Sequence, residues 1–430
     1  MNDYGKDLLN NGLRVITVEM PHLHSAEMVF YVGVGGRHED PGLAGISHFL
    51  EHMIFRGTAE HPSSLHLEQA FEMIGGMVNA STDIETTCYH SRIHPDRIDE
   101  GIALFASMVQ RPLFRELEIE RRIVLEEALE DLNEEGDDIN PDNLTASLLW
   151  PDSPLSLPTV GTSETISRIG VAHLRRHHET FYTPANSVLV VAGRIRRDNV
   201  AAAAERHFGG WGHTPPPLPA LWRPDGAPDR AQTAWVRDSD SQVSLQLAFR
   251  TPERQNDLAV PLRVLRRLLS WGGTSRLMLR LRERLGLTYH VEASLSLFAE
   301  CGCLSVDLAI APDNLVPALG ETLAILKELC QKPVGAEELE RAVRSYLYDL
   351  EFSRDHPDDL AIRYGWGELV GYLRTLEEDR RDIAAIEPES LLQAARTVFA
   401  GACPKMAVVG PYREQDRRRV EDLMTRFSQK

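Results

Sequence analysis

Two histidines and a glutamate stand within five residues of an apolar run, in the segment GISHFLEHMIFRGT. On a helix, His48 and His52 are four residues apart and share one face, and Glu51 lies beside them, three residues from His48. Burying three ionisable groups in an apolar helix is costly unless a partner compensates for it. The pattern therefore predicts a zinc site with a carboxylate next to it, rather than three core residues.

Tetrahedral zinc with one open position needs a third protein ligand, which must come from another segment. The best candidate is the helical pattern ELEIERRIVLEEALEDLNEE, in which Glu120 and Glu127 are seven residues apart and share a face. We expect Glu127 to be the ligand, with Glu126 as the alternative. We expect Glu120 to contact a ligand without binding the metal itself. The competing interpretation is that this acidic helix is an ordinary solvated surface.

With three ligands from elsewhere, Glu51 is free to act as a general base. Zinc lowers the pKa of a water molecule to about 7, so a nearby carboxylate can remove its proton as it attacks a polarised carbonyl. Peptide hydrolysis is the reaction that this chemistry favours.

The elements that must position these residues form two similar halves. A chain of 430 residues exceeds the usual size of one domain, and the Pro-rich segment from Trp211 to Arg230 can continue neither a helix nor a β-ladder. We predict a first domain at 1–214, a linker at 215–230 and a second domain at 231–430. The run AEMVFYVGVGGRHED has a counterpart in SQVSLQLAFRTPERQND. Three further pairs lie 217 to 220 residues apart, namely Phe181 and Phe399, Pro184 and Pro404, and Gly193 and Gly410.

Within each half, strand-like runs with hairpin spacing alternate with longer helical patterns. In the first half, SSLHLEQAFEMIGG reads as a helix, MVNASTDIETTCYHSRI as a strand pair and DEGIALFASMVQRPLF as a second helix. The short segments between these strand-like runs favour antiparallel pairing over a doubly wound parallel sheet. We therefore predict an α+β fold of two homologous domains, each a mostly antiparallel sheet flanked by helices and joined by the Pro-rich linker.

Composition excludes several classes of protein. The formal net charge is −18 and no Lys/Arg cluster is evident, which argues against nucleic acid as a partner. No run has the length of a membrane span, and the N-terminal residues do not have the pattern of a targeting signal. The five cysteines are spread thinly, as in proteins of a reducing compartment. We expect a soluble cytoplasmic protein with no membrane partner.

The order HxxEH is the inverted zinc motif, and here it resembles the pitrilysin-like (M16) zinc metallopeptidases. The resemblance continues through GGMVNASTDIETTCY, ERRIVLEE, PLSLPTVGTSETI and FYTPANSVLVVAG. It implies one Zn²⁺ per chain. Because the distal glutamate of this family follows the motif at about the separation seen here, the resemblance favours Glu127 over Glu126.

Two further pairs of site residues follow from the resemblance alone. The segment GGTSRLMLRLRERLGLTYHVEA resembles the family's Arg/Tyr segment, which implies that Arg282 and Tyr289 reach the substrate near the zinc. There the Tyr hydroxyl can donate to a developing oxyanion and the Arg can hold the substrate backbone. Asn79 and Ala80 match the strand that pairs with the substrate backbone at a sheet edge.

The resemblance also implies an assembly. Short members of the family pair two chains into a closed chamber, in which the Arg/Tyr domain of one chain completes the zinc site of the other. We expect a homodimer with two such sites, while a related M16 subunit as the partner stays open. The expected function is cleavage of unstructured peptides. Two alternatives are a peptidase dedicated to a leader or presequence and a non-catalytic assembly subunit of the same fold, against which the intact His48, Glu51 and His52 argue.

Overall fold

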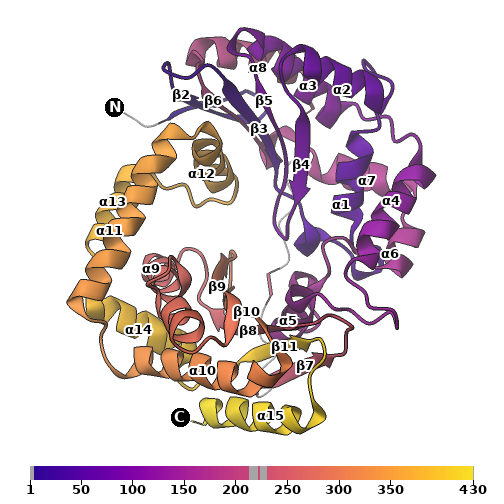
Figure 1. The fold of residues 1–430 in the computed structure, drawn as a ribbon. Helices are drawn as coiled ribbons and strands as arrows, with labels where there is room; N and C mark the ends of the chain where they lie inside the picture. Colours follow the sequence, from indigo (N-terminus) through magenta and orange to yellow (C-terminus); the bar gives the residue numbers. More distant parts are fainter. Residues whose placement is uncertain (1–3, 213–220, 223–229, 430) are drawn as a thin grey trace. The chain divides into compact units, whose positions relative to one another are not determined.

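Residues 4–212, 221–222 and 230–429 are described by the computed structural model (Figure 1). Most of the predicted linker at 215–230 lies outside the described residues. The chain forms two units. Unit 1 comprises Met1–Ala128, Leu157–Ala220 and Glu351–Leu376, and unit 2 comprises Leu129–Ser156, Leu221–Leu350 and Glu377–Lys430.

Unit 1 is built on a six-stranded sheet in the order β1-β2-β6-β3-β5-β4. Only the β2–β6 pair is parallel among these neighbours. The central strands are buried on both faces, as expected from their continuous apolar runs, whereas β4 at the edge alternates. The strands are β1 (Gly5–Leu8), β2 (Arg14–Glu19), β3 (Ala26–Val32), β4 (Val78–Thr82), β5 (Thr87–Ile93) and β6 (Ser187–Gly193).

Helices cover both faces of this sheet. In Figure 1, α3 and α8 lie on one side of it and α12 on the other, where α12 contacts β2, β3 and β6. Helix α1 packs against β4, β5 and α7. The helices of unit 1 are α1 (Ile46–Ile54), α2 (Ser64–Met73), α3 (Ile98–Gln110), α4 (Leu117–Leu129), α6 (Ser163–Arg168), α7 (Val171–Phe181), α8 (Arg197–Phe208) and α12 (Pro357–Leu369).

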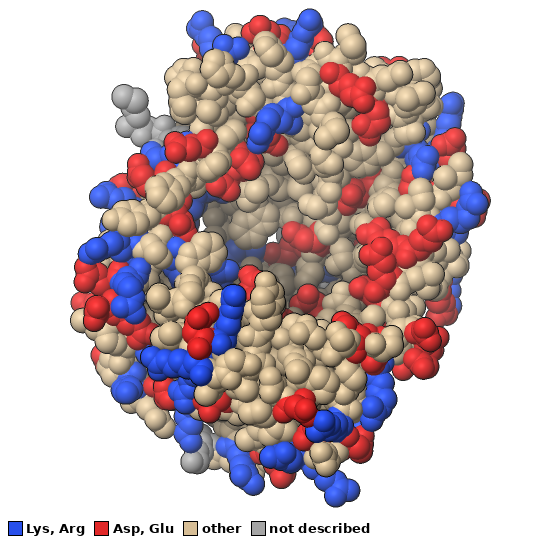
Figure 2. Space-filling model, in the orientation of Figure 1, with Lys and Arg blue, Asp and Glu red and all other residues tan. Residues whose placement is uncertain are grey.

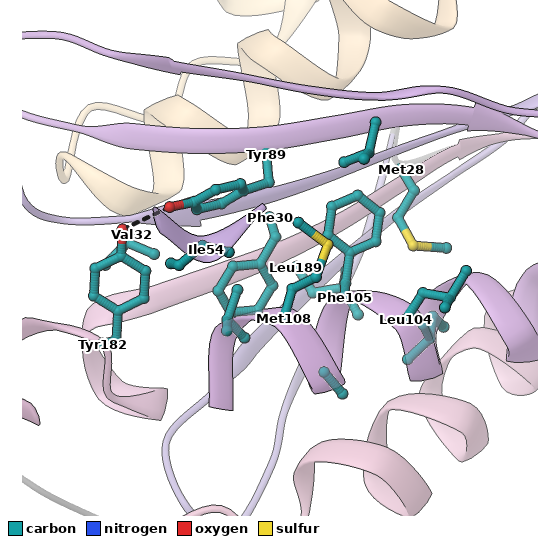
Figure 3. Close-up of a cluster of buried hydrophobic side chains, with 14 of the residues drawn as sticks. Met28, Phe30, Val32, Ile54, Tyr89, Leu104, Phe105, Met108, Tyr182 and Leu189 are labelled. Carbon is teal, nitrogen blue, oxygen red and sulfur yellow. Dashed lines mark hydrogen bonds between the residues drawn. The ribbon is translucent and has the colours of Figure 1, made fainter. Parts of the chain in front are cut away.

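The core of unit 1 lies on the face of the sheet that α3 covers. Phe30, Phe105 and Met108 pack there with their side chains fully buried (Figure 3). The only polar contact drawn in this close-up joins the hydroxyls of Tyr89 and Tyr182, which are 2.7 Å apart. Because each hydroxyl finds its partner in the other, two tyrosines can fill the interior without an unsatisfied polar group.

Unit 2 has a five-stranded sheet in the order β7-β11-β8-β10-β9. Its helix α5 contacts β7, β8 and β11, while α9 packs on β9 and α14 on β8. The strands are β7 (Gln232–Val236), β8 (Val243–Thr251), β9 (Thr288–Leu297), β10 (Gly302–Ile310) and β11 (Lys405–Val409). The helices are α5 (Pro141–Leu149), α9 (Ala259–Ser270), a π-helical segment (Met278–Arg284), α10 (Leu315–Gln331), α11 (Ala336–Phe352), α13 (Leu376–Ala384), α14 (Pro388–Phe399) and α15 (Glu414–Ser428).

The two sheets repeat one topology. The order β2-β6-β3-β5-β4 in unit 1 matches β7-β11-β8-β10-β9 in unit 2, and the first pair is parallel in each case. Gly193 is the last residue of β6 and Gly410 directly follows β11, with φ angles of 135° and 123°. A Cβ at these positions would lie 2.4 Å and 2.5 Å from the carbonyl oxygens of Ser25 and Gln242, so both strands need glycine there. The predicted α+β fold of two similar domains is confirmed.

The units differ from the predicted domains by an exchange of segments. Residues 129–156, with α5, belong to unit 2, and residues 351–376, with α12, belong to unit 1. Each half of the chain therefore supplies a helix to the sheet of the other half. The reason is that α5 and α12 bury their apolar faces on a sheet distant in sequence, a choice that local patterns cannot reveal.

Charged side chains of both signs are interspersed over the face drawn in Figure 2. Among the described residues, no helix is both long and apolar enough to cross a membrane. All five cysteines are described, and none of them forms a disulfide.

Candidate metal centre

Helix α1 is held at its N-terminus by a buried carboxylate. Glu39 is 5% exposed and accepts hydrogen bonds from the backbone N–H groups of Gly45 at 2.6 Å and Ser47 at 2.8 Å. These bonds serve N–H groups that have no partner inside the helix, and a negative charge at this end suits the helix dipole. Burial raises the pKa of Glu39 to about 7, against the lowering effect of these bonds. Helix α1 is also held by its apolar face, on which Ile46, Phe49, Leu50 and Met53 are buried.

The structure brings His48, His52 and Glu127 together. Each offers one donor atom, and the three donor atoms all lie within 4.8 Å of one another. The Nε2 atom of His48 is 3.4 Å from Oε1 of Glu127, and Nε2 of His52 is 3.6 Å from Oε2. Ligands at about 2.0–2.2 Å from a tetrahedral zinc ion lie roughly 3.3–3.6 Å apart. The donor spacing therefore fits Zn²⁺.

The protonation state of His48 also suits a metal ligand, which must be a neutral imidazole. Burial, and to a smaller extent the charge of His52, lowers the pKa of His48 to about 4, so its ring is neutral near pH 7. Burial opposes charge on His52 as well, but the hydrogen bond to Glu120 and the charges of Glu51 and Glu127 raise its pKa. In His52, Nδ1 lies 3.1 Å from Oε2 of Glu120, which leaves Nε2 to face Glu127.

Glu51 lies beside the three donors without belonging to them. Its side chain is 7% exposed, and burial raises the pKa of its carboxyl group, against the lowering effect of a hydrogen bond from the Thr82 hydroxyl at 2.6 Å. A carboxylate that accepts a proton more readily than an exposed one is suited to acid–base chemistry near neutral pH.

The alternative ligand Glu126 is exposed on α4 and is not among the clustered donors. Within the part of the chain that the structure describes, His48, His52 and Glu127 form the only cluster of three or more such side chains with metal-binding spacing.

Among the described residues, the second repeat holds no cluster of donors with metal-binding spacing. Helix α9 follows β8 as α1 follows β3, but it contains no histidine or carboxylate and carries Arg267. The guanidinium of Arg267 contacts Asp349 of α11 at 2.5 Å and Ser345 at 2.7 Å. An arginine–aspartate pair thus joins α9 to α11 in unit 2.

Comparison with known proteins decides the family. The family model described as insulinase (peptidase family M16) matches residues 14–163, and the model described as peptidase M16 inactive domain matches residues 168–346. The chain therefore belongs to peptidase family M16. The inactive-domain match covers α9 and Arg267, in agreement with the missing donors of the second repeat.

Relatives in the M16 family span nearly the whole chain. An uncharacterized zinc protease of Mycobacterium bovis is 33% identical over 415 residues, covering 94% of this chain and 92% of the relative. The uncharacterized zinc protease YmxG of Bacillus subtilis is 30% identical over 395 residues, covering 90% and 94%. The fold matches a protease from Helicobacter pylori with a TM-score of 0.88, at 21% identity and with 96% and 100% of the two chains covered.

Glu120 connects this M16 site to an arginine that the sequence did not point to. Besides the His52 ring, its carboxylate contacts the guanidinium of Arg56, and Arg56 also lies 3.3 Å from Glu116. The His52 bond and the positive charge of Arg56 lower the pKa of Glu120 despite its burial. Glu120 therefore stays ionised and fixes the orientation of the His52 ring.

Replacing Glu120 with glutamine is expected to weaken zinc binding by roughly 10- to 100-fold, the usual effect of losing a partner that orients a ligand. Zinc affinity measured by competition with a chromophoric chelator checks this result. The control is Glu118→Gln, because Glu118 is exposed on the same helix and pairs with Arg121. Equal affinities for the two variants would show that Glu120 does not orient His52.

Of the remaining predicted residues, Asn79, Ala80 and Tyr289 lie on edge strands, and Arg282 lies in the π-helical segment that precedes β9. Asn79 is exposed and Ala80 half-buried on β4, which pairs only with β5 among the described strands. Arg282 and Tyr289 belong to unit 2, where the guanidinium carbon of Arg282 lies 5.2 Å from the centre of the Tyr289 ring. Tyr289, at the start of the edge strand β9, is 78% exposed. Their roles toward a substrate stay predictions.

Sequence reasoning missed Glu39, Arg56 and Thr82. Thr82 is two residues after Ala80 in an alternating strand, so its side chain could have been placed on the same face as Ala80. No sequence signal marks Glu39 or Arg56, because their roles arise from turns that return them to α1 and α4.

Proposed function

We propose that this chain is a zinc-dependent endopeptidase that hydrolyses unstructured peptides, with one Zn²⁺ per chain held by His48, His52 and Glu127. The observation that carries the proposal is the clustering of these three donors within 4.8 Å of one another, with the Glu51 carboxylate beside them. Two relatives named as zinc proteases support it. Five cysteines without a disulfide suit a reducing compartment, so we place the activity in the cytoplasm.

Zn²⁺ supplies a Lewis acid that polarises a carbonyl and makes water more acidic near neutral pH. The chain's own residues transfer the proton and orient the ligands. Glu51 accepts the proton of the attacking water and passes it to the nitrogen of the leaving amine, a transfer that its raised pKa favours. Glu120 keeps His52 in the tautomer that presents Nε2.

The peptide docks as an added strand along the free edge of β4 in this proposal, with Asn79 and Ala80 contacting its backbone. Main-chain pairing holds an extended segment with little regard to its side chains, which favours unstructured peptides over folded proteins. The acidic net charge of −18 favours basic peptides among them.

Removing the metal tests this function. A chelator is expected to abolish hydrolysis of a quenched-fluorescent unstructured peptide, and stoichiometric Zn²⁺ is expected to restore it. Hydrolysis that persists in metal-free protein would contradict the proposal.

We further propose that two chains pair, and that Arg282 and Tyr289 of one chain serve the metal centre of the other. Tyr289 donates a hydrogen bond to the oxyanion and Arg282 holds the peptide backbone. The support is that both side chains stand on unit 2, whereas the metal donors stand on unit 1. The intact donor set disfavours a purely structural assembly role.

Mixing two inactive variants tests the pairing. Combining His52→Ala chains with Arg282→Ala chains is expected to restore partial activity, since in a mixed dimer one of the two sites is built from intact residues only. Subunit exchange is verified with differently tagged chains. No recovery in verified mixed dimers would rule out sites shared between chains.

A further inference from the structure

The orientation of Glu51 depends on one hydroxyl group. The Oγ1 atom of Thr82 donates a hydrogen bond to Oε2 of Glu51 at 2.6 Å. The other hydroxyl near Thr82 belongs to Thr87, at 3.4 Å, and Thr87 donates its own proton to the carbonyl of Val34 at 2.9 Å. Since a hydroxyl has one proton to give, that of Thr82 goes to the carboxylate at the shorter distance. Oε2 of Glu51 is thereby anchored, which leaves Oε1 as the oxygen that takes a proton from water.

Thr82 is also the last residue of β4, the edge strand on which peptide docking is proposed. The turn after it is tied to the segment that leads into α1. The backbone N–H of Gly36 donates to the carbonyl of Asp83 at 3.1 Å, and that of Arg37 donates to the carbonyl of Ile84 at 2.9 Å. This end of β4 therefore keeps a fixed position relative to α1, whereas the outer edge of the strand is open.

We propose that Thr82 is a positioning residue that holds Glu51 in the orientation for proton transfer. The inference rests on the proposed peptidase function. Ala80 and Thr82 lie on the same face of the strand, two residues apart. A peptide paired with the backbone at Ala80 would therefore lie beside the end of the strand that carries the Thr82 hydroxyl.

The test replaces Thr82 with valine, which keeps the shape of the side chain and removes the hydroxyl. We expect kcat to fall roughly 10- to 100-fold, as for other partners that orient a site residue, with KM and zinc content close to those of the wild type. Thr82→Ser keeps the hydroxyl and is expected to restore most of kcat. The matched control is Ser81→Ala, since the Ser81 hydroxyl contacts Cys88 at 3.2 Å instead of Glu51.

A second measurement separates this role from a structural one. In a Glu51→Gln background, adding Thr82→Val is expected to change neither the residual rate nor the affinity for a fluorescent peptide measured by anisotropy, because Thr82 acts through the Glu51 carboxylate. If the wild type cleaves peptides and Thr82→Val does so equally fast, the inference is wrong while the proposed function stands. Failure of serine to rescue, or an additive effect in the Glu51→Gln background, also overturns it. A wild type that cleaves nothing overturns the proposed function itself, and the inference with it.

Discussion

Replacing His52 with alanine is expected to abolish both stoichiometric zinc binding and peptide hydrolysis. The variant keeps only two of the three clustered donors, and catalytic zinc sites need three protein ligands. The zinc affinity should fall by more than about 100-fold, since losing even a residue that only hydrogen-bonds a ligand costs roughly 10- to 100-fold. Zinc content by mass spectrometry after dialysis and kcat/KM with a quenched peptide check the two effects.

The control for this variant is His22→Ala, because His22 is exposed and lies outside the donor cluster. Circular dichroism verifies that both variants fold. Wild-type zinc content in His52→Ala would show that the three donors are not the metal site.

Replacing Glu127 with glutamine is the second change with a large expected effect. It removes the charged donor of the cluster, and a neutral amide is a poor zinc ligand. Zinc at about 100 times its Kd stabilises a protein by ~2.7 kcal/mol, so addition of zinc should raise the unfolding temperature of the wild type clearly. The variant should lose this rise, a result measurable without any substrate.

Glu126→Gln is the matched control, since it makes the same chemical change one residue earlier on the exposed face of α4. It should keep the wild-type response to zinc. If Glu126→Gln loses the response and Glu127→Gln keeps it, the assignment of the third ligand is wrong.

Much of the site could be predicted from sequence because its spacing is local. His48, Glu51 and His52 lie within one helical turn and a half, so their shared face follows from helix geometry alone. Glu120 and Glu127 share a face of α4 for the same reason. The contact between α4 and α1 could not be derived in this way, and the resemblance strengthened the choice of Glu127 over Glu126.

Other features depend on contacts between distant segments. The exchange of α5 and α12 between the two sheets follows from which apolar faces fit together in three dimensions. The Glu39 carboxylate reaches the start of α1 only because the chain turns between them. The duplication itself was visible in sequence from the matching positions of Gly193 and Gly410. The structure gives the reason for the match, because a Cβ atom at either position would clash with a backbone carbonyl oxygen.

The second repeat illustrates that a fold can persist without its chemistry. Arg267 and Asp349 join α9 to α11 through an ion pair, in the repeat that lacks the three donors. The donor cluster found among the described residues lies in unit 1 alone.

The central claim is that Glu51 and the three donors beside it hydrolyse peptides. The most direct measurement is mass spectrometry of a mixture of basic and neutral unstructured peptides after incubation with zinc-loaded protein and, in parallel, with its Glu51→Gln variant. We predict internal cuts by the wild type that fall by roughly 10²- to 10⁴-fold in the variant, the usual contribution of a general base, with zinc content unchanged. Cuts that persist in Glu51→Gln, or no cuts by zinc-loaded wild type, would contradict this account.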